Sequence, residues 1–267
     1  RSGEMPDLFE QIEMPGFSPA YDPKTKYGYT NPHYKRNLKE LLNKTSEGFC
    51  MYCYVTVAAD GKLWGHLEHS IKKTNSKYLT ECIPNIGWTC PVCNDIFKKY
   101  KEKERKLSQK DITIFERKIK CSSNRCTKAC AKYKNLKNKY LRQENAQIIL
   151  QPNGVKGFDT GFELKIQYNV QNGWFEPSAF QGEYSEQERQ FIEKHINRFH
   201  LNDEAYRTNA LITFFEDVIE GEGHIVRTPE NNMVVRVFKK RLEGLERQDV
   251  LRICKKLYTY YMVKLKA

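Results

Sequence analysis

Three short runs within residues 49–99 decide the fold: Cys50-Met-Tyr-Cys53, Gly65-His66-Leu67-Glu68-His69 and Thr89-Cys90-Pro-Val-Cys93-Asn94. The first and third runs are Cys-x-x-Cys pairs, and they bracket the second. Four thiolates in two such pairs suit tetrahedral Zn²⁺, and four cysteine ligands leave no open coordination position for a substrate. The sequence therefore predicts a structural zinc site formed by Cys50, Cys53, Cys90 and Cys93.

Two strands and a helix are expected around this site. Residues 54–69 are predicted to form a β-hairpin, because a β-prone run precedes the turn signal Asp60-Gly61. On the returning strand, His66 and Glu68 would share one face. Apolar side chains at helical spacing predict a helix over residues 95–107. Strand, strand and helix, tied by zinc, make a compact unit of the α+β class.

The polar residues of this unit resemble the motif of the HNH endonuclease family. In its ββα-metal motif, an acidic residue precedes a His, an Asn lies in the middle, and a His or Asn follows a Cys-x-x-Cys. Within this family, the Gly-His-x-Glu-His motif of residues 65–69 is most similar to the corresponding motif of PtuB-type nucleases from Septu and retron-linked anti-phage systems. The matching residues are Glu68, His69, Asn85 and Asn94.

The resemblance implies a role for each of these residues in phosphodiester hydrolysis. His69 would be the general base that takes a proton from the attacking water. Glu68 and Asn94 would supply oxygen ligands to a catalytic Mg²⁺ or Mn²⁺. Asn85 would orient the histidine and shape the loop. His66 is a further metal ligand, a phosphate contact or a group that supports the ligands.

The same resemblance implies partners. A PtuB-type nuclease works beside an ABC-family ATPase of the PtuA type, which restrains or activates it. In retron-linked systems, a reverse transcriptase and its noncoding RNA join the complex. The substrate expected on this basis is nucleic acid, with DNA favoured and RNA as the alternative.

Two other functions fit part of the pattern. The first is a non-catalytic zinc protein that binds nucleic acid or a partner. The second is a zinc-dependent nucleobase deaminase, because His66-Leu-Glu68 and Cys90-Pro-Val-Cys93 partly resemble that signature. Thr89 stands where the deaminase signature has Pro. The deaminase pattern also leaves four residues without a role: Cys50, Cys53, Asn85 and Asn94.

The chain is basic, which favours a polyanionic partner. It contains 45 Lys and Arg against 33 Asp and Glu, a formal net charge of +12. Residues 98–145 hold 17 Lys and Arg and five Asp and Glu. Such a run is either a solvated face or a track for phosphates, and the adjoining HNH-like motif favours the track. The residues predicted to bind nucleic acid are Lys98, Lys99, Lys101, Lys103, Arg105 and Lys106.

The other cysteines are less informative, and the compartment follows from the whole set. Nine cysteines, no secretory leader and no apolar run long enough to span a membrane predict a reducing, cytoplasmic location. A second zinc site is an alternative to free or buried thiols, although the spacings are irregular. Its ligands would be Cys82, Cys121, Cys126 and Cys130.

Three parts are expected along the chain. Residues 1–45 form a Pro- and Tyr-rich extended arm with a short helix, and residues 46–148 form the HNH nuclease domain with its basic helical extension. Residues 149–267 form a mainly helical C-terminal domain. The arm's helix is expected over residues 37–43. The C-terminal domain is expected to contain a strand over 162–170, a helix with a capping box at Ser185 and Glu188, and a helix from 202 to 219.

Overall fold

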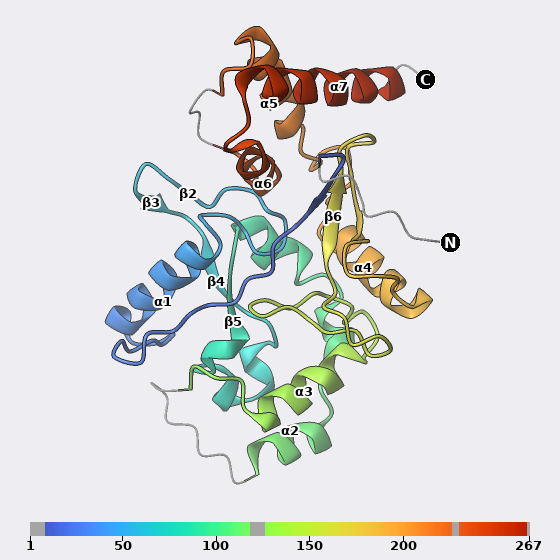
Figure 1. Cartoon of the computed structure of the whole chain (residues 1–267). Coiled ribbons are helices and arrows are strands. Elements are labelled where there is room, and N and C mark those ends of the chain that lie inside the picture. The colour runs from blue at the N-terminus through green and yellow to red at the C-terminus, as the bar shows by residue number, and fades with distance from the viewer. Residues whose placement is uncertain (1–8, 118–125, 226–229, 266–267) are drawn as a thin grey trace. The chain divides into compact units, whose positions relative to one another are not determined.

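The computed structural model describes residues 9–117, 126–225 and 230–265 (Figure 1). The chain divides into two compact units, as far as it is described. The first unit consists of residues 1–15, 54–56 and 156–267, and the second of residues 16–53 and 57–155. Both helices and strands are present, so the predicted α+β class is confirmed. The predicted boundaries near residues 45 and 148 stay a prediction.

The second unit begins with an arm that leads into helix α1 (Pro32–Thr45). The side-chain oxygen of Asn31 accepts hydrogen bonds from two N–H groups of the first turn, and proline occupies the first helical position. Leu38 and Leu42 form the buried face of this helix. The helix expected over residues 37–43 is therefore present, and it starts five residues earlier and ends two residues later.

The central strand pair of this unit differs from the expected hairpin. Strand β4 (His66–His69) pairs antiparallel with β5 (Ile86–Thr89), and not with the segment before the Asp60-Gly61 turn. That turn joins two short strands, β2 (Ala58–Ala59) and β3 (Lys62–Leu63). Every residue of β5 is buried whereas β3 is exposed, so β5 provides the interior partner that β4 requires. The hairpin prediction was wrong about this pairing.

The segment after Asn94 is not one helix. A π-helical turn, η4 (Cys93–Phe97), is followed by the 3₁₀ turn η5 (Glu102–Arg105). Lys101 lies between them with a φ of +52°, in the left-handed region, and this conformation ends the helical path. The predicted continuous helix over 95–107 was therefore wrong. Regular helices resume at α2 (Gln109–Glu116) and α3 (Ala131–Leu141).

Short 3₁₀ turns connect β4 to β5. They are η1 (Lys73–Asn75), η2 (Lys77–Leu79) and η3 (Ile83–Asn85). The loop that contains these turns carries the backbone carbonyl groups and the asparagine that position the candidate site described below.

In the part of the first unit that the structure describes, a three-stranded antiparallel sheet is combined with four helices. The strands follow the order β1 (Gln11–Glu13), β6 (Ile166–Asn169) and β7 (Trp174–Pro177). The helices are α4 (Glu186–Arg198), α5 (Ala210–Glu220), α6 (Met233–Leu242) and α7 (Arg247–Leu265). Its mainly helical character and its strand within 162–170 agree with the sequence. The helix expected from residue 202 begins only at Ala210.

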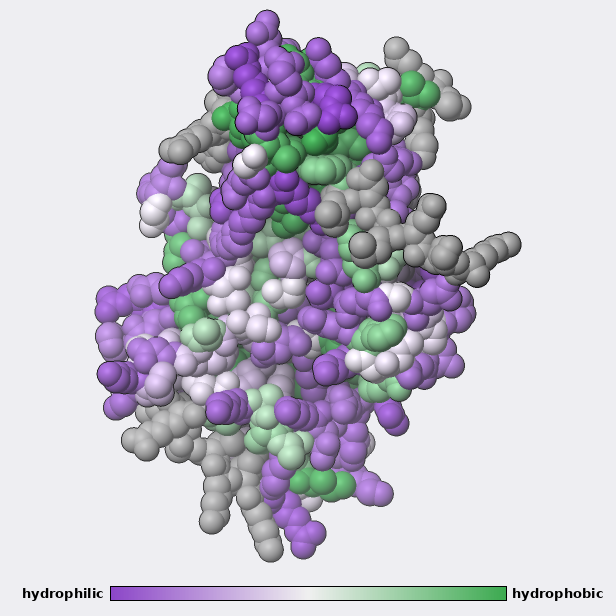
Figure 2. Space-filling view, viewed as in Figure 1, coloured by the Kyte–Doolittle hydropathy of each residue, from purple (hydrophilic) through white to green (hydrophobic). Residues whose placement is uncertain are grey.

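Hydrophilic side chains cover most of the face shown in Figure 2. No helix in the described part of the chain is long and apolar enough to cross a membrane.

The buried carboxylate of Glu188 ties helix α4 to the loop before it. The predicted capping box is present: the Ser185 hydroxyl accepts from the N–H of Glu188, and the Glu188 carboxylate accepts from the N–H of Ser185. Glu188 also accepts hydrogen bonds from the N–H groups of Asp159 and Thr160, at 3.0 and 2.9 Å. One side chain therefore satisfies donors on two segments.

We expect Glu188→Ala to lower the free energy of unfolding by about 2–3 kcal/mol, because it leaves several N–H donors without a partner. Glu186→Ala, in the same helical turn but exposed, is the matched control and should cost less than about 0.5 kcal/mol. Urea unfolding followed by circular dichroism measures both. Equal effects of the two changes would contradict the assigned role of Glu188.

Candidate active site

Four cysteines converge on one point in the second unit. The sulfur atoms of Cys50, Cys53, Cys90 and Cys93 all lie within 4.8 Å of one another. The Cys53 and Cys90 sulfurs are 3.7 Å apart. With Zn–S bonds of about 2.3 Å, tetrahedral geometry places neighbouring sulfurs about 3.8 Å apart. The four thiols therefore fit one zinc ion.

The backbone around these cysteines supports thiolate charge. The N–H of Tyr52 lies 3.5 Å from the Cys50 sulfur, and the N–H of Cys93 lies 3.4 Å from the Cys90 sulfur. Hydrogen bonds from Cys50, and then from the other two thiols, hold the pKa of the Cys90 thiol well below its usual range. Hydrogen bonds from Cys50, and then from the neighbouring thiols, raise the pKa of the Cys53 and Cys93 thiols. A cation bound among the four sulfurs would favour the thiolate form of all of them.

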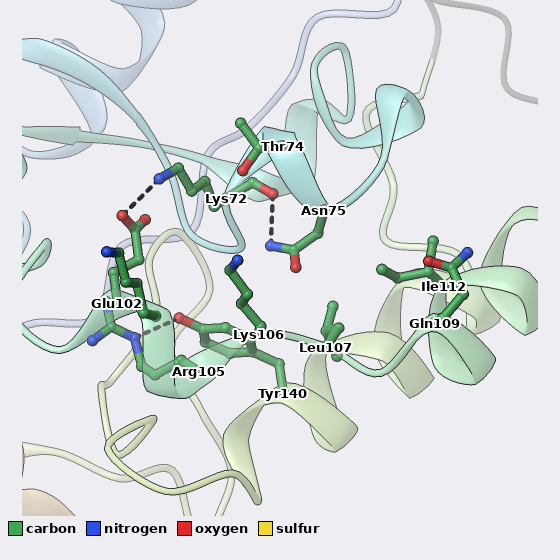
Figure 3. Close-up of a pocket in the computed structure, with 11 residues that line it drawn as sticks. Lys72, Thr74, Asn75, Glu102, Arg105, Lys106, Leu107, Gln109, Ile112 and Tyr140 are labelled. Atoms are coloured by element: carbon green, nitrogen blue, oxygen red, sulfur yellow. Dashed lines mark hydrogen bonds and ion pairs between the residues drawn. The ribbon is translucent and has the colours of Figure 1, made fainter.

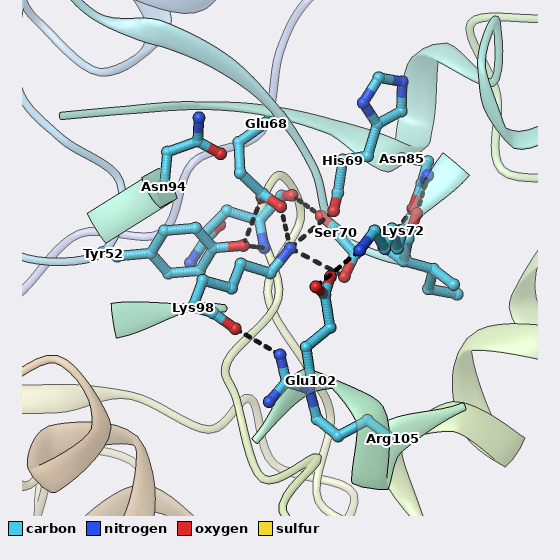
Figure 4. A network of polar contacts seen from close by, with 12 residues as sticks. Tyr52, Glu68, His69, Ser70, Lys72, Asn85, Asn94, Lys98, Glu102 and Arg105 are labelled. Atoms are coloured by element: carbon cyan, nitrogen blue, oxygen red, sulfur yellow. Dashed lines mark hydrogen bonds and ion pairs between the residues drawn. The ribbon is translucent and has the colours of Figure 1, made fainter. Parts of the chain in front are cut away.

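Next to this cluster, Glu68 forms a buried ion pair with Lys98 (Figure 4). The Lys98 ammonium donates to the Glu68 carboxylate, and to the backbone oxygens of His69 and Ser70 at 2.6 and 3.0 Å. The Tyr52 hydroxyl donates to the other Glu68 oxygen at 3.1 Å. Glu68 is only 4% exposed and Lys98 only 7%. Both oxygens of the carboxylate therefore have partners inside the protein.

A buried arginine, Arg105, hydrogen-bonds to the backbone of Lys98. The Arg105 guanidinium donates to the backbone oxygens of Lys98 and Tyr100, and to the Tyr140 hydroxyl at 3.0 Å. Burial, and then the nearby Arg105 charge, lower the pKa of Lys98. Lys98 and Arg105 were both predicted to contact nucleic acid. Their charged groups are instead directed inward, so this arrangement does not favour a phosphate contact for either residue.

His69 is held in a form suited to accept a proton. Its Nε2 lies 3.0 Å from the backbone oxygen of Thr80, which cannot donate, so Nε2 carries the proton and Nδ1 keeps its lone pair. Burial lowers the pKa of His69, and the neutral ring is the main form near pH 7. Figure 4 shows the ring directed away from the Glu68 carboxylate. This follows from the alternation of side chains along β4.

The N-terminal arm contributes a ring that packs against His69. The Tyr29 ring lies edge-on to the imidazole, with a centroid distance of 4.5 Å. The Glu81 carboxylate fixes the arm at this point by accepting from the N–H groups of Tyr29 and Thr30, each at 2.8 Å. The Lys73 ammonium lies 4.4 Å from the centre of the Tyr29 ring. Sequence reasoning noted the tyrosine-rich arm but not this contact, because the motif carries no information about the arm.

Asn85 is fully buried and shapes the loop after β4. Its side-chain oxygen accepts from the N–H of Ile71 at 2.8 Å, and its amide donates to the oxygen of the same residue at 2.8 Å. The Tyr133 hydroxyl donates to the same side-chain oxygen at 3.1 Å. Asn85 therefore holds the backbone of Ile71 in the loop after β4, and its role at a catalytic site stays a prediction. The His69 ring makes its hydrogen bond to the backbone oxygen of Thr80.

A pocket of about 200 Å³ brings several predicted site residues together. His69, Glu68 and Asn94 line it, as do Lys98 and Lys99. Tyr29, Lys72, Lys73 and Asp95 complete much of the rest of its wall. His66 and Asn85 are not in the lining. His66 is exposed and lies next to Asn94, with 3.4 Å between its Nδ1 and the Asn94 side-chain nitrogen.

A second hollow of about 400 Å³ adjoins the first (Figure 3). The two share Lys72, Glu102 and Arg105 among their lining residues. Lys103 and Lys106, both predicted to bind nucleic acid, line this second hollow and are exposed. Lys101 is exposed next to the ring of Tyr100, at 5.8 Å from its centre. Two exposed lysines of the basic segment, Lys103 and Lys106, thus lie in the hollow that shares lining residues with the His69 pocket.

Within the described residues, the four-cysteine cluster is the one group of three or more His, Cys, Asp or Glu side chains close enough together to hold a metal ion. The alternative of a second zinc site, which includes Cys121, is not tested by this. Cys82 is buried, Cys126 is half-buried and Cys130 is exposed. Cys121 lies outside the described residues.

Comparison with protein-family models, with curated proteins and with solved structures finds no match for this chain. The fold and the site define the class directly. This is an α+β protein with a four-cysteine cluster that fits zinc, and a basic pocket that contains a histidine lies beside that cluster.

We expect purified protein to hold zinc through the four-cysteine cluster, and Cys93→Ser to lower the zinc content by about one ion per chain. Elemental analysis after dialysis measures this. Cys130→Ser is the matched control, because Cys130 lies outside the cluster and serine also caps helices. Equal zinc content in the wild type and the Cys93 variant would contradict the assignment.

Two adjacent lysines test whether the Glu68 ion pair is structural. Lys98→Met leaves a buried carboxylate without its charge partner and should cost about 3–5 kcal/mol of unfolding free energy. Lys99→Met removes an exposed pair with Asp95 and should cost less than about 1 kcal/mol. Urea titration of the zinc-loaded proteins makes the comparison. Similar losses for both variants would show that Lys98 is not buried against Glu68.

Proposed function

We propose that this protein is a metal-dependent HNH-type endonuclease that hydrolyses phosphodiester bonds of nucleic acid. The observation that carries this proposal is the state of His69. Its ring is neutral, its Nε2 is fixed by a backbone oxygen, and it lines a pocket whose wall is rich in lysine. A base with a free lone pair and surrounding positive charge matches what attack by water on a phosphodiester requires.

The reaction assigns a distinct task to each group. The Nδ1 atom of His69 takes the proton of the attacking water. Lys72, Lys73 and Lys99 line the same pocket and attract the phosphate. A divalent cation would neutralise the charge that develops on the phosphoryl oxygens and on the leaving 3′ oxygen.

The Glu68 and Asn94 pair that the family resemblance assigns to Mg²⁺ or Mn²⁺ does not fit a cation as it is arranged. Asn94 lies on the pocket wall and is half-buried. Glu68, however, already bonds to an ammonium through one oxygen and to a hydroxyl through the other. A cation would have to replace Lys98 at Glu68, and the chemistry above therefore uses no metal bound there.

The substrate and partners follow from the same proposal. The adjoining basic hollow and its exposed Lys103 and Lys106 favour a polyanion longer than one nucleotide. DNA is the favoured substrate and RNA the alternative. An ABC-family ATPase of the PtuA type, with or without a retron reverse transcriptase and its RNA, is the proposed regulator in an anti-phage system.

A non-catalytic zinc protein that binds nucleic acid is the second candidate. The internal neutralisation of Glu68 by Lys98 favours it, since a carboxylate committed to the interior has no role in catalysis. The deaminase candidate loses support. Its catalytic zinc would need His66 together with Cys90 and Cys93, but those cysteines group with two further cysteines instead.

We expect His69→Ala to lower the rate of DNA or RNA cleavage with Mn²⁺ or Mg²⁺ by about 10²–10⁴-fold, because it removes the proton acceptor. Binding of a labelled strand, measured by fluorescence anisotropy, should be unchanged. His33→Ala, at an exposed position on α1, is the matched control and should cleave like the wild type.

If the protein alone cleaves no strand, the assay with the proposed partner distinguishes an inactive enzyme from a binding protein. The assay is run with the protein alone and with its ATPase partner and ATP. Strand binding without cleavage in both settings would support the non-catalytic candidate and contradict the nuclease. Base conversion in intact strands would point to the deaminase.

A further inference from the structure

A cluster of three potential metal ligands lies at the edge of the His69 pocket, outside the Glu68 ion pair. We propose that Asp95, together with His66 and Asn94, binds a divalent transition-metal ion there. The inference deepens the proposed nuclease function and rests on it for the metal's role in cleavage. The binding of the ion itself is tested separately.

The donor atoms already have the spacing of ligands around one ion. The His66 Nδ1 lies 3.4 Å from an Asp95 carboxylate oxygen and 3.4 Å from the Asn94 amide. The Asn94 amide lies 3.3 Å from the other Asp95 oxygen. Metal–ligand bonds of about 2.1 Å place neighbouring octahedral ligands about 3.0 Å apart. The cluster therefore needs to contract by only a few tenths of an ångström, and the Asn94 amide needs to turn its oxygen inward.

The existing contacts among these three residues are weak as hydrogen bonds. At 3.3–3.4 Å, these two nitrogen–oxygen contacts and one nitrogen–nitrogen contact are longer than ordinary hydrogen bonds. Their side chains converge without making a strong bond to one another. A cation between them would use lone pairs that these contacts leave largely unused.

The paired strands β4 and β5 and the turn after Cys93 position these three residues. His66 is the first residue of β4 and pairs with Thr89 on β5. Asn94 and Asp95 follow Cys93 directly in the π-helical turn η4. The four-cysteine cluster thus fixes the turn that presents two of the three ligands, and β5 links it to the third.

The cluster is open to solvent and adjoins the histidine pocket. The side chains of His66 and Asp95 are 44% and 45% exposed. Asn94 and Asp95 line the same pocket as His69. Three protein ligands on one side leave the remaining positions for water and for a phosphate oxygen, as catalytic metal sites require.

Each carboxylate already pairs with a lysine, and the pair of Asp95 with Lys99 is weaker than the pair of Glu68 with Lys98. The Lys99 ammonium lies 3.0 Å from an Asp95 oxygen, but this is an exposed pair four residues apart. Such pairs contribute about 0.5 kcal/mol and are easily displaced. Lys98 at Glu68 is buried and makes three hydrogen bonds. A divalent ion would therefore displace Lys99 from Asp95 at a much lower free-energy cost than Lys98 from Glu68.

The ligand types also predict which metal binds. An imidazole nitrogen with a carboxylate and an amide oxygen favours Mn²⁺, Co²⁺ or Ni²⁺ over Mg²⁺, which prefers oxygen ligands alone. We therefore expect tighter binding of Mn²⁺ than of Mg²⁺ to the zinc-loaded protein.

Binding of Mn²⁺ to the zinc-loaded protein, measured by electron paramagnetic resonance of the free ion, tests the site. Asp95→Asn and His66→Gln should each weaken Mn²⁺ binding by about tenfold or more. Glu68→Gln and Glu102→Gln, at two other acids of the same pocket, should leave binding within about threefold. Loss of Mn²⁺ binding in Glu68→Gln with retention in Asp95→Asn would overturn the proposal.

A second measurement, which leaves Glu68 unchanged, covers the case in which the Glu68 variant fails to fold. Pulsed paramagnetic resonance of Mn²⁺ on His69→Ala protein with ¹⁵N-labelled histidine should show a coupling to histidine nitrogen, since His66 is then the histidine at the site. No coupling, or no Mn²⁺ binding at millimolar concentration, would overturn the metal site. Neither result depends on cleavage, so a site that binds Mn²⁺ without strand breaks would overturn the nuclease alone.

Discussion

The second unit depends on four thiols that meet at one point. Residues 50–53 and 90–93 are far apart in sequence, and their sulfurs lie within 4.8 Å of one another. This convergence fixes the end of β5 and the start of η4, and it thereby determines where Asn94 and Asp95 stand relative to β4. Zinc bound by the four cysteines would raise the stability of a unit with short strands and interrupted helices, because its binding free energy offsets the conformational entropy lost when the loops become ordered.

Charge in the pocket is arranged in two layers. The inner layer is held by partners inside the protein: Glu68 pairs with Lys98, and Arg105 donates to backbone oxygens and to Tyr140. The outer layer contains exposed lysines, the exposed His66 and Asp95, and the half-buried Asn94. Buried charges need partners within the protein, whereas exposed ones remain available to phosphates and metal ions. The proposed chemistry therefore uses the outer layer and His69.

The sequence predicted the features that depend on local chemistry. The Cys-x-x-Cys spacing predicted the cluster, the Asp60-Gly61 turn formed as expected, and the Ser185–Glu188 capping box is present. It failed where tertiary contacts decide. The partner of β4 is a strand about twenty residues later, and Lys101 in a left-handed conformation interrupts the helix that the apolar spacing predicted. Local patterns carry no information about such long-range choices.

The candidate site shows the same division. The residues that resemble the HNH motif could be named from the sequence, and His69, Glu68 and Asn94 do line one pocket. The pairing of Lys98 with Glu68, and the packing of Tyr29 on His69, could not be predicted, because each joins segments about 30 to 40 residues apart. Lysine and arginine in a basic run suggest phosphate contacts. The structure shows that Lys98 and Arg105 are buried and bond to groups inside the protein, which the sequence does not reveal.

The central claim is that the protein uses water to hydrolyse a phosphodiester. The most direct measurement is mass spectrometry of a DNA or RNA strand after incubation in H₂¹⁸O with the zinc-loaded protein, Mn²⁺ and the ATPase proposed as its partner. We predict strand breaks with one ¹⁸O in each new 5′-phosphate. Intact strands, or breaks without ¹⁸O, would contradict the account.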